Sequence, residues 1–135
     1  VELAADPQWG RGAPWRVARR AHHTLSQDRM IDGHNRMLEA GLASPFGEEP
    51  MVVGTPLPMG VPDEQVTTRV PIGKHFAIKQ AAMAAHRSQI GPDSFFLNLP
   101  DEVAVEMFGI EEFVIVAGSR AIGDDLDLFA GLDRR

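Results

Sequence analysis

The sequence predicts a mixed α/β fold, and three stretches of the chain carry that prediction. Residues 75–89 are rich in alanine and contain neither glycine nor proline, so a helix is their default structure. Residues 111–117, Glu-Glu-Phe-Val-Ile-Val-Ala, are dominated by β-branched and aromatic side chains, which favours a strand. In residues 64–72, Val66 and Val70 alternate with polar neighbours, as in a half-buried strand. We therefore expect a few strands, two main helices and long loops.

The first half of the chain is expected to be more irregular. Residues 1–5 resemble the last turn of a helix that Pro7 stops, and a chain that starts inside a helix suggests a further segment upstream. Residues 15–21 are expected to form a short strand. Residues 42–63 are rich in proline and glycine and predict a long irregular connection, a kind of segment that is usually functional or disordered. Within it, residues 51–53 are expected to pair briefly as an edge strand.

One helix is expected between these segments. Thr24 or Ser26 can cap its N-terminus, and Gly41 ends it after Ala40. Its packed face, read from helical spacing, consists of Met30, His34, Met37 and Leu38.

The second half contains shorter elements around the two strong strands. Residues 94–99 are apolar and aromatic and are expected to pack over the end of the alanine-rich helix. Residues 101–108 follow a proline and begin with two acids, which predicts a helix that Gly109 closes. Residues 118–125 are expected to be a loop, and residues 126–132 a last short helix.

Composition bounds the class of protein. The chain has 135 residues, 44% of them hydrophobic, and a net charge of −6, which argues against a nucleic-acid-binding protein. Arg11, Arg16, Arg19 and Arg20 cluster early and either face solvent or meet an anion. There is no cysteine, so disulfides, thiolate catalysis and cysteine-based zinc sites are excluded. This composition allows a reducing cytoplasm without proving it, and the cytoplasm is the compartment that we expect. No apolar run approaches the roughly 20 residues that a membrane-spanning helix needs.

The histidines do not predict a complete metal site. A catalytic zinc usually takes three protein ligands, and no His-Glu-x-x-His pair is present. His75 and His86 would stand about 16 Å apart on one helix, too far to share an ion. His22 and His23 would point to opposite sides of an extended segment. The acidic residues Asp124, Asp125 and Asp127 lack the glycine and glutamate spacing of a calcium loop.

A narrow stripe of the alanine-rich helix is polar. On a helix, His75, Lys79, Ala82, His86 and Gln89 fall within about 80° of one another. The functional interpretation is one wall of a polar cleft, because small residues between polar ones leave room for a ligand. The alternative is a solvated helix face with a histidine near each end.

Three segments, in order, resemble one enzyme family. They are Gly-Val-Pro-Asp-Glu-Gln-Val-Thr-Thr-Arg-Val from Gly60, the run from Lys79 to Gln89 that ends in Ala-His-x-Ser-Gln, and Glu-Glu-Phe-Val-Ile-Val-Ala-Gly from Glu111 with Asp-Leu-Phe-Ala-Gly-Leu behind it. Over residues 54–135 the chain is similar to the C-terminal part of the zinc-dependent N-deacetylases related to N-acetylglucosaminyl-phosphatidylinositol de-N-acetylase. That family includes the deacetylase of mycothiol biosynthesis and the mycothiol S-conjugate amidase.

The resemblance implies a Rossmann-like α/β fold of which this chain is the C-terminal portion. Residues 1–135 would form a single segment of a larger domain, with residues 1–53 as helix remnant, loop, helix and connection. Residues 54–135 would carry the family-like strand, the His-x-Ser-Gln helix and the late strand. The family holds zinc through an Ala-His-Pro-Asp-Asp and a His-Pro-Asp-His segment, and this chain contains neither. The zinc ligands and the general base are therefore expected on an N-terminal half, which would be the partner of this chain.

The resemblance also implies roles for residues in this chain. Gln89 would approach the active site from the side opposite the metal and orient a side chain or the substrate. His86 would buttress its helix, and Lys79 would pair with an acid in the other half. The chain would supply a cleft wall and no catalytic residue of its own.

The implied reaction is hydrolysis of the acetamide of an N-acylated amino sugar. Zinc would polarise the carbonyl and activate water, while a carboxylate takes the proton. Two alternatives stay open: a stand-alone, non-catalytic module that binds sugar or another partner, and a metalloenzyme complete within this chain. Homo-oligomerisation is also left open by the sequence.

Overall fold

The computed structural model describes residues 2–8, 12–118 and 126–132, and it is mixed α/β. Three strands, β1 (Arg19–Thr24), β2 (Thr68–Pro71) and β3 (Ile110–Gly118), form the sheet. The helices are α1 (Glu2–Ala5), α2 (Gln27–Glu39), α3 (Phe76–Ala85), α4 (Phe95–Asn98) and α5 (Asp101–Phe108), with 3₁₀ turns η1 (Asp63–Gln65) and η2 (Gly73–His75). Among these described residues, no helix is long and apolar enough to cross a membrane.

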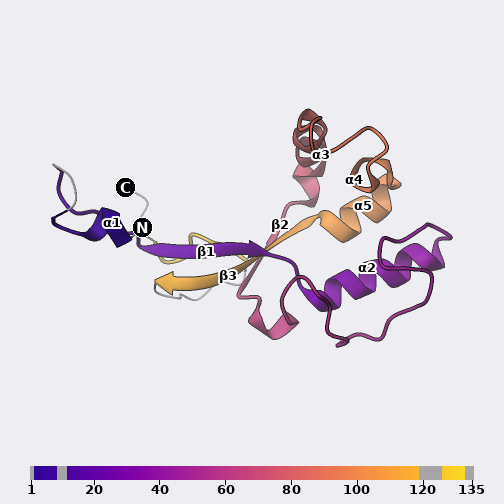
Figure 1. The fold of residues 1–135 in the computed structure, drawn as a ribbon, viewed down its shortest axis with the longest axis horizontal. Coiled ribbons are helices and arrows are strands. Elements are labelled where there is room, and N and C mark those ends of the chain that lie inside the picture. Colours follow the sequence, from indigo (N-terminus) through magenta and orange to yellow (C-terminus); the bar gives the residue numbers. More distant parts are fainter. Residues whose placement is uncertain (1, 9–11, 119–125, 133–135) are drawn as a thin grey trace.

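The sheet is antiparallel, with β3 in the centre. Its order is β1-β3-β2, and the register of the β1–β3 pair runs from Arg19 opposite Gly118 to Thr24 opposite Glu112, with an irregularity after Arg20. The ribbon of β1 and β3 extends away from the helices, while β2 pairs with the end of β3 that adjoins them (Figure 1). An extended hairpin-like arm therefore joins a cluster of helices at one end of the molecule.

The hydrophobic core lies in that helical end. Met37 of α2, Phe76 of α3 and Ala104 of α5 are buried together with Leu99, which lies between α4 and α5. Gly33 allows α2 and α5 to approach closely, since a Cβ there would stand only 2.8 Å from Cε of Met107. The core is small for the chain, whose accessible surface is 9580 Å². A compact monomer of 14.8 kDa would expose about 7000 Å².

A buried carboxylate joins the central strand to its neighbours. Glu112 of β3 is 3% exposed, and its Oε2 accepts a hydrogen bond from the backbone N–H of Ser26 at 2.8 Å. Its Oε1 accepts one from Nε of Arg69 in β2 at 3.1 Å, and Nη1 of Arg29 stands 3.5 Å away. Ser26 also caps α2, because its Oγ accepts from the N–H of Arg29 while donating to Asp63. Since a buried charge must be compensated, this network fixes the start of α2 against the sheet.

Two polar side chains of α2 hold the long connection against the helix. His34 is fully buried, and its Nε2 donates to the carbonyl of Glu49 at 2.8 Å while its Nδ1 lies 2.7 Å from Oγ of Ser44. Because the carbonyl only accepts, Nε2 carries a proton. Asn35 pairs with both the N–H and the carbonyl of Met51. These contacts order a segment that has almost no regular structure.

Several predicted elements are confirmed. Helix α5 and strand β3 agree with the predicted segments 101–108 and 111–117 to within a residue, and α2 begins after Ser26 and ends before Gly41. Of the predicted packed face of α2, His34 and Met37 are fully buried, and Ile31 joins them.

Other predictions were wrong in their boundaries. The first strand lies at residues 19–24 instead of 15–21, because its register with β3 decides where pairing begins. Residues 64–72 shorten to β2 because η1 occupies their start. Residues 51–53 are not a strand, and Met51 instead bonds the side chain of Asn35. Residues 126–132 form turns instead of a helix. Residues 119–125 of the predicted loop lie outside the described residues.

The His-x-Ser-Gln segment was predicted to be helical, and this prediction was wrong. Helix α3 ends at Ala85, and the N–H of His86 bonds the carbonyl of Met83, three residues back. The N–H groups of Gln89 and Ile90 then both bond the carbonyl of His86 in a separate turn. The exposed side chains of residues 86–89 bury nothing that would hold another helical turn in place. A Rossmann-like arrangement stays a prediction, because the strands described here pair only antiparallel.

We predict that Glu112→Gln destabilises the protein by about 3 kcal/mol, because it leaves Arg69 and Arg29 without their buried counter-charge. Chemical denaturation followed by circular dichroism measures this. The matched control is Glu106→Gln, which removes an exposed ion pair with Arg36 and should cost about 0.5 kcal/mol or less. Equal effects of the two substitutions would contradict the structural role given to Glu112.

Candidate functional site

A cavity of about 430 Å³ opens between α2, α5 and the aromatic residues of α4. Four of the six methionines and four of the seven phenylalanines of the chain line it. These are Met30, Met37, Met59, Met107, Phe46, Phe95, Phe96 and Phe108. Such a volume and an apolar lining with a few polar groups are typical of small-molecule sites.

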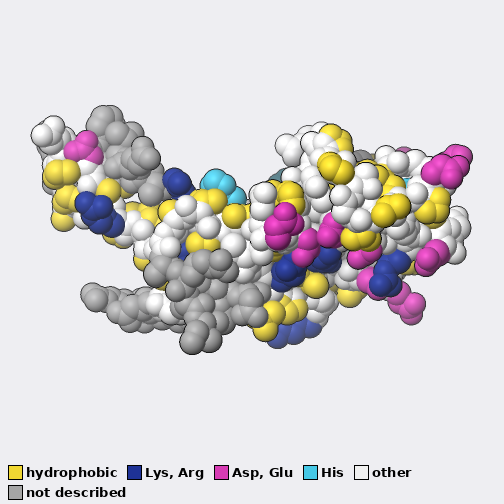
Figure 2. All heavy atoms as spheres, turned by 90° about the horizontal axis from the view of Figure 1, so that it is seen from below, with side chains coloured by type: hydrophobic (Ala, Val, Ile, Leu, Met, Phe, Trp, Pro, Cys, Tyr) yellow, Lys and Arg dark blue, Asp and Glu magenta, His cyan; other side chains and the backbone are white. Residues whose placement is uncertain are grey.

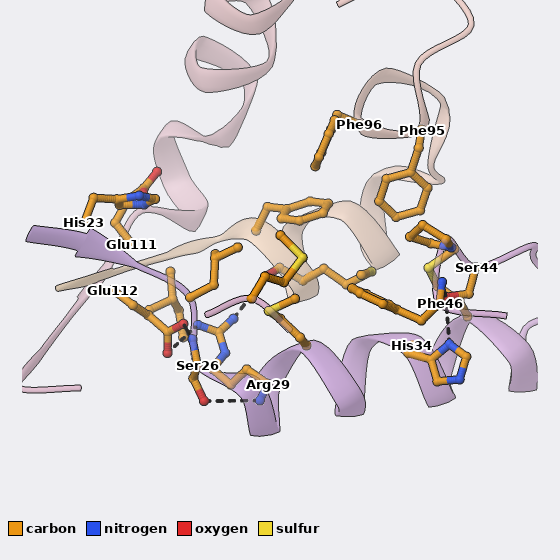
Figure 3. A pocket seen from close by; sticks show the side chains of 18 of the residues that line it. His23, Ser26, Arg29, His34, Ser44, Phe46, Phe95, Phe96, Glu111 and Glu112 are labelled. Atoms are coloured by element: carbon orange, nitrogen blue, oxygen red, sulfur yellow. Dashed lines mark hydrogen bonds and ion pairs between the residues drawn. The ribbon is translucent and has the colours of Figure 1, made fainter. Parts of the chain in front are cut away.

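The aromatic wall is held by ring contacts. Phe95 and Phe96 of α4 meet edge to face at 5.4 Å, and both pack on Phe108 at the end of α5, at 6.1 and 5.5 Å. The predicted packing of residues 94–99 against α3 is confirmed, and the rings of α4 also contact Phe108 of α5. Figure 3 shows Phe95 and Phe96 above the cavity and His34, Ser44 and Phe46 at one side.

The polar end of the cavity is an ion cluster of Glu111, Lys79 and His23. Oε1 of Glu111 accepts from Nζ of Lys79 at 2.7 Å, and Oε2 lies 2.6 Å from Nε2 of His23. Burial tends to raise the pKa of Glu111, but the hydrogen bond and charge of Lys79, and then those of His23, outweigh it and hold this pKa below its ordinary value. Glu111 is therefore a carboxylate that accepts two hydrogen bonds.

Lys79 has a second partner that fixes its position. Nζ also donates to the carbonyl of Phe108 at 3.1 Å, the last residue of α5, and lies 6.0 Å from the ring centroid of Phe108. Cations are favourable at a helix C-terminus, and Arg29 donates to the carbonyls of Glu106 and Met107 in the same turn. The expected acidic partner of Lys79 is thus found in this chain, as Glu111, because β3 starts directly after α5.

The other two predicted site residues lie elsewhere. His86 and Gln89 are exposed and do not line the cavity, so the structure separates them from Lys79. The end of α3 at Ala85 breaks the helical stripe that would have aligned them. Their roles toward a substrate or another polypeptide stay predictions.

The described residues do not fit a zinc ion. Within residues 2–8, 12–118 and 126–132, no three histidine, aspartate or glutamate side chains are grouped so that they could hold a metal. The zinc that the family resemblance implies would need ligands from other polypeptide, which stays a prediction.

Sequence reasoning missed His23 and Glu111. His23 lies opposite Phe113 in the β1–β3 register, so Glu111, two residues from Phe113, is its diagonal neighbour on the same sheet face. The sequence signal was only the alternation within each strand. The register between segments 88 residues apart was needed to bring the two side chains together.

We predict that Lys79→Met raises the pKa of Glu111, because the burial effect then acts with only His23 to oppose it. A ¹³C NMR titration of the Glu111 carboxyl measures the shift, and Lys74→Met, an exposed lysine of η2, serves as control. Since the folded pKa is depressed, the stabilisation by Glu111 is complete above its unfolded value near 4.5 and is lost as the pH falls through the folded pKa. An unchanged pKa in Lys79→Met would refute the ion cluster.

Comparison with known proteins gives consistent matches. The chain is 34% identical over 137 positions to 1D-myo-inositol 2-acetamido-2-deoxy-α-D-glucopyranoside deacetylase 2 of Frankia alni, covering 96% of this chain and 46% of that protein. Deacetylases of the same name from Thermomonospora curvata and Geodermatophilus obscurus are 34% and 35% identical, over 97% and 98% of this chain and 45% and 46% of theirs. No known family profile and no solved structure matches the chain.

The chain spans about half the length of the relatives that it matches. The match nevertheless runs through nearly all of its own residues, including the three segments on which the resemblance rested. The chain is therefore a homologue of these acetamido-glucopyranoside deacetylases over about half their length, and the predicted resemblance is confirmed.

Proposed function

We propose that this chain is part of an N-deacetylase that hydrolyses the acetamide of an N-acetylated amino sugar. The observation that carries the proposal is the 34% identity to deacetylases named for such a substrate along 96% of the chain. The reaction consumes water and releases acetate and the free amine. In this proposal the chain forms a wall of the substrate cleft, with its cavity and the cluster of Glu111, Lys79 and His23 facing the substrate.

The proposal places the zinc and the general base in polypeptide that corresponds to the unmatched half of the relatives. That half would complete a Rossmann-like domain, and it is the proposed partner of this chain in the cytoplasm. Two observations support this division. The described residues offer no ligand set for a metal, and the chain exposes about 2600 Å² more surface than expected of a compact monomer. Figure 2 shows apolar side chains exposed among charged ones over the helical end, and Ile78 of α3 is 70% exposed.

The proposal predicts that this chain can replace the matching half of a relative. In a fusion of the unmatched half of the Frankia alni deacetylase 2 with residues 1–135, we expect release of acetate from N-acetylglucosaminyl-inositol in the presence of zinc. Neither half alone should release it. Within the fusion, Lys79→Met should lower kcat/KM by about tenfold, the lower range for groups that support an active site, and Lys74→Met should leave it unchanged. Acetate is measured by an enzyme-coupled assay.

A folded fusion that binds zinc but releases no acetate would overturn the proposal. The alternative, a non-catalytic sugar-binding or interaction module, rests on the cavity of about 430 Å³ with its apolar lining and few polar groups. It predicts that the isolated 135 residues melt cooperatively and bind an amino sugar without zinc. Calorimetry of the isolated chain with N-acetylglucosamine distinguishes the two.

A further inference from the structure

The cavity between α2, α4 and α5 is large and apolar for a chain with so small a core. Protein interiors are close-packed, and apolar side chains normally close on one another and leave little empty space. We propose that this cavity binds an apolar small-molecule group, either a two-ring aromatic system or an alkyl chain of similar bulk. The inference goes beyond the proposed function and stands without it, because such binding needs neither zinc nor other polypeptide.

The volume of the cavity sets the size of the ligand. An apolar cavity of about 150 Å³ can hold a benzene molecule. At about 430 Å³, this cavity is nearly three times as large. It also falls within the usual range of small-molecule sites, about 300–1000 Å³. We therefore expect a ligand with more than one ring, or an aliphatic group of the same bulk.

The side chains that line the cavity favour an apolar ligand. The apolar lining consists of methionines from α2 and α5, phenylalanine rings from α4 and α5, and Phe46 and Met59 from the connection of residues 42–63. Phenyl rings pair edge to face with other aromatic rings. Methionine is flexible, fills irregular gaps and makes favourable contacts with aromatic groups. This lining can therefore close around an aromatic or aliphatic group.

The polar groups of the cavity already have partners within the chain. Both ring nitrogens of His34 are engaged, by a hydroxyl and by a carbonyl of the connection. Arg29 donates to two carbonyls of α5 and stands beside the carboxylate of Glu112. Lys79 pairs with Glu111 and donates to a third carbonyl of α5. A sugar or inositol ring would lose the hydrogen bonds that water makes to its hydroxyls and find few in return, so the cavity disfavours such a ring.

The walls of the cavity are held by contacts within this chain. The rings of α4 pack on Phe108 of α5, and Figure 3 shows Phe95 and Phe96 above the cavity. On the other side, Nε2 of Gln27 donates to the carbonyls of Leu57 and Met59, at 2.9 and 3.2 Å. These bonds fix the end of the connection on α2. The site is therefore formed by segments of this chain before any other polypeptide docks.

The methionines supply an internal control for a binding test. Four of the six line the cavity, and the other two, Met51 and Met83, do not. With ¹³C-labelled methionine methyl groups in residues 1–135, 2-naphthol should shift the four lining NMR signals by its ring current, in one saturable step. The signals of Met51 and Met83 should stay unchanged. An equal response of all six signals, or no response, would overturn the inference.

The same spectra test the preference for an apolar ligand. N-acetylglucosamine at the same concentration should shift none of the four lining signals, because its hydroxyls find few free partners in the cavity. If the sugar shifts these signals as much as 2-naphthol does, the cavity is not selective for apolar groups and the inference fails.

A charge placed on the lining tests the site by mutation. Met59→Glu should weaken the binding of 2-naphthol about tenfold or more, because the ligand would have to displace water from the new carboxylate. The matched control is Val53→Glu in the same connection, which should leave the affinity unchanged. Val53 and Met59 are 51% and 50% exposed, and Val53 does not line the cavity. An equal loss in both variants, or a loss in neither, would contradict the assigned site.

The fusion described above decides whether the other half of the enzyme fills the cavity. We expect 2-naphthol to bind the fusion and to shift the signals of the same four methionines. If an active fusion excludes 2-naphthol, side chains of the other half occupy the cavity and the inference is overturned. A fusion that binds 2-naphthol and releases no acetate would instead contradict the proposed function alone, so the two failures are distinguishable.

Discussion

The buried carboxylate of Glu112 is the constraint on which the arrangement of this chain depends. It lies on the central strand, next to the point where β1 ends and α2 begins, and it is only 3% exposed. Its charge is tolerable only because Arg69, Arg29 and the N–H of Ser26 converge on it. Arg69 comes from β2, whereas Arg29 and Ser26 belong to α2 and its N-cap, so compensating one charge fixes β2 and α2 against β3. The direction in which α2 leaves the sheet, and with it the floor of the cavity, follows from this contact.

The adjacent residue, Glu111, faces the other way and gathers a second set of charges. Alternation along β3 sends the two side chains to opposite faces of the sheet, and Glu111, which is 24% exposed, belongs to the ion cluster at the polar end of the cavity. Lys79 joins this carboxylate to the carbonyl end of α5, where the positive charge also offsets the helix dipole. Two adjacent residues of β3 therefore carry carboxylates in different surroundings. That of Glu112 is buried and structural, and that of Glu111 is partly exposed and accessible to a ligand.

The small core and the large accessible surface have a common cause, which is the arrangement of a three-stranded sheet beside short helices. The hydrophobic core cluster lies in the helical end. The strands β1 and β3 extend away from it as a ribbon (Figure 1), and no residue of β1 is fully buried. Since burial scales with the contact made between layers, a sheet of three strands beside short helices cannot bury what a complete α/β domain buries. A chain that is homologous to about half the length of a deacetylase is expected to bury little and to expose a large surface.

The sequence by itself determined α2, α5 and β3, because their caps, terminal glycines and β-branched runs act within a few residues. The sequence also revealed the resemblance to the deacetylases, since each of the three segments that carry it is a continuous run of residues. The tertiary structure alone decided where α3 ends and which groups form the site. His86 and Gln89 follow helical spacing only if the helix continues, and nothing packs there to continue it. His23 and Glu111 meet because two strands far apart in sequence pair in one register, and such pairing depends on the whole fold rather than on local residues.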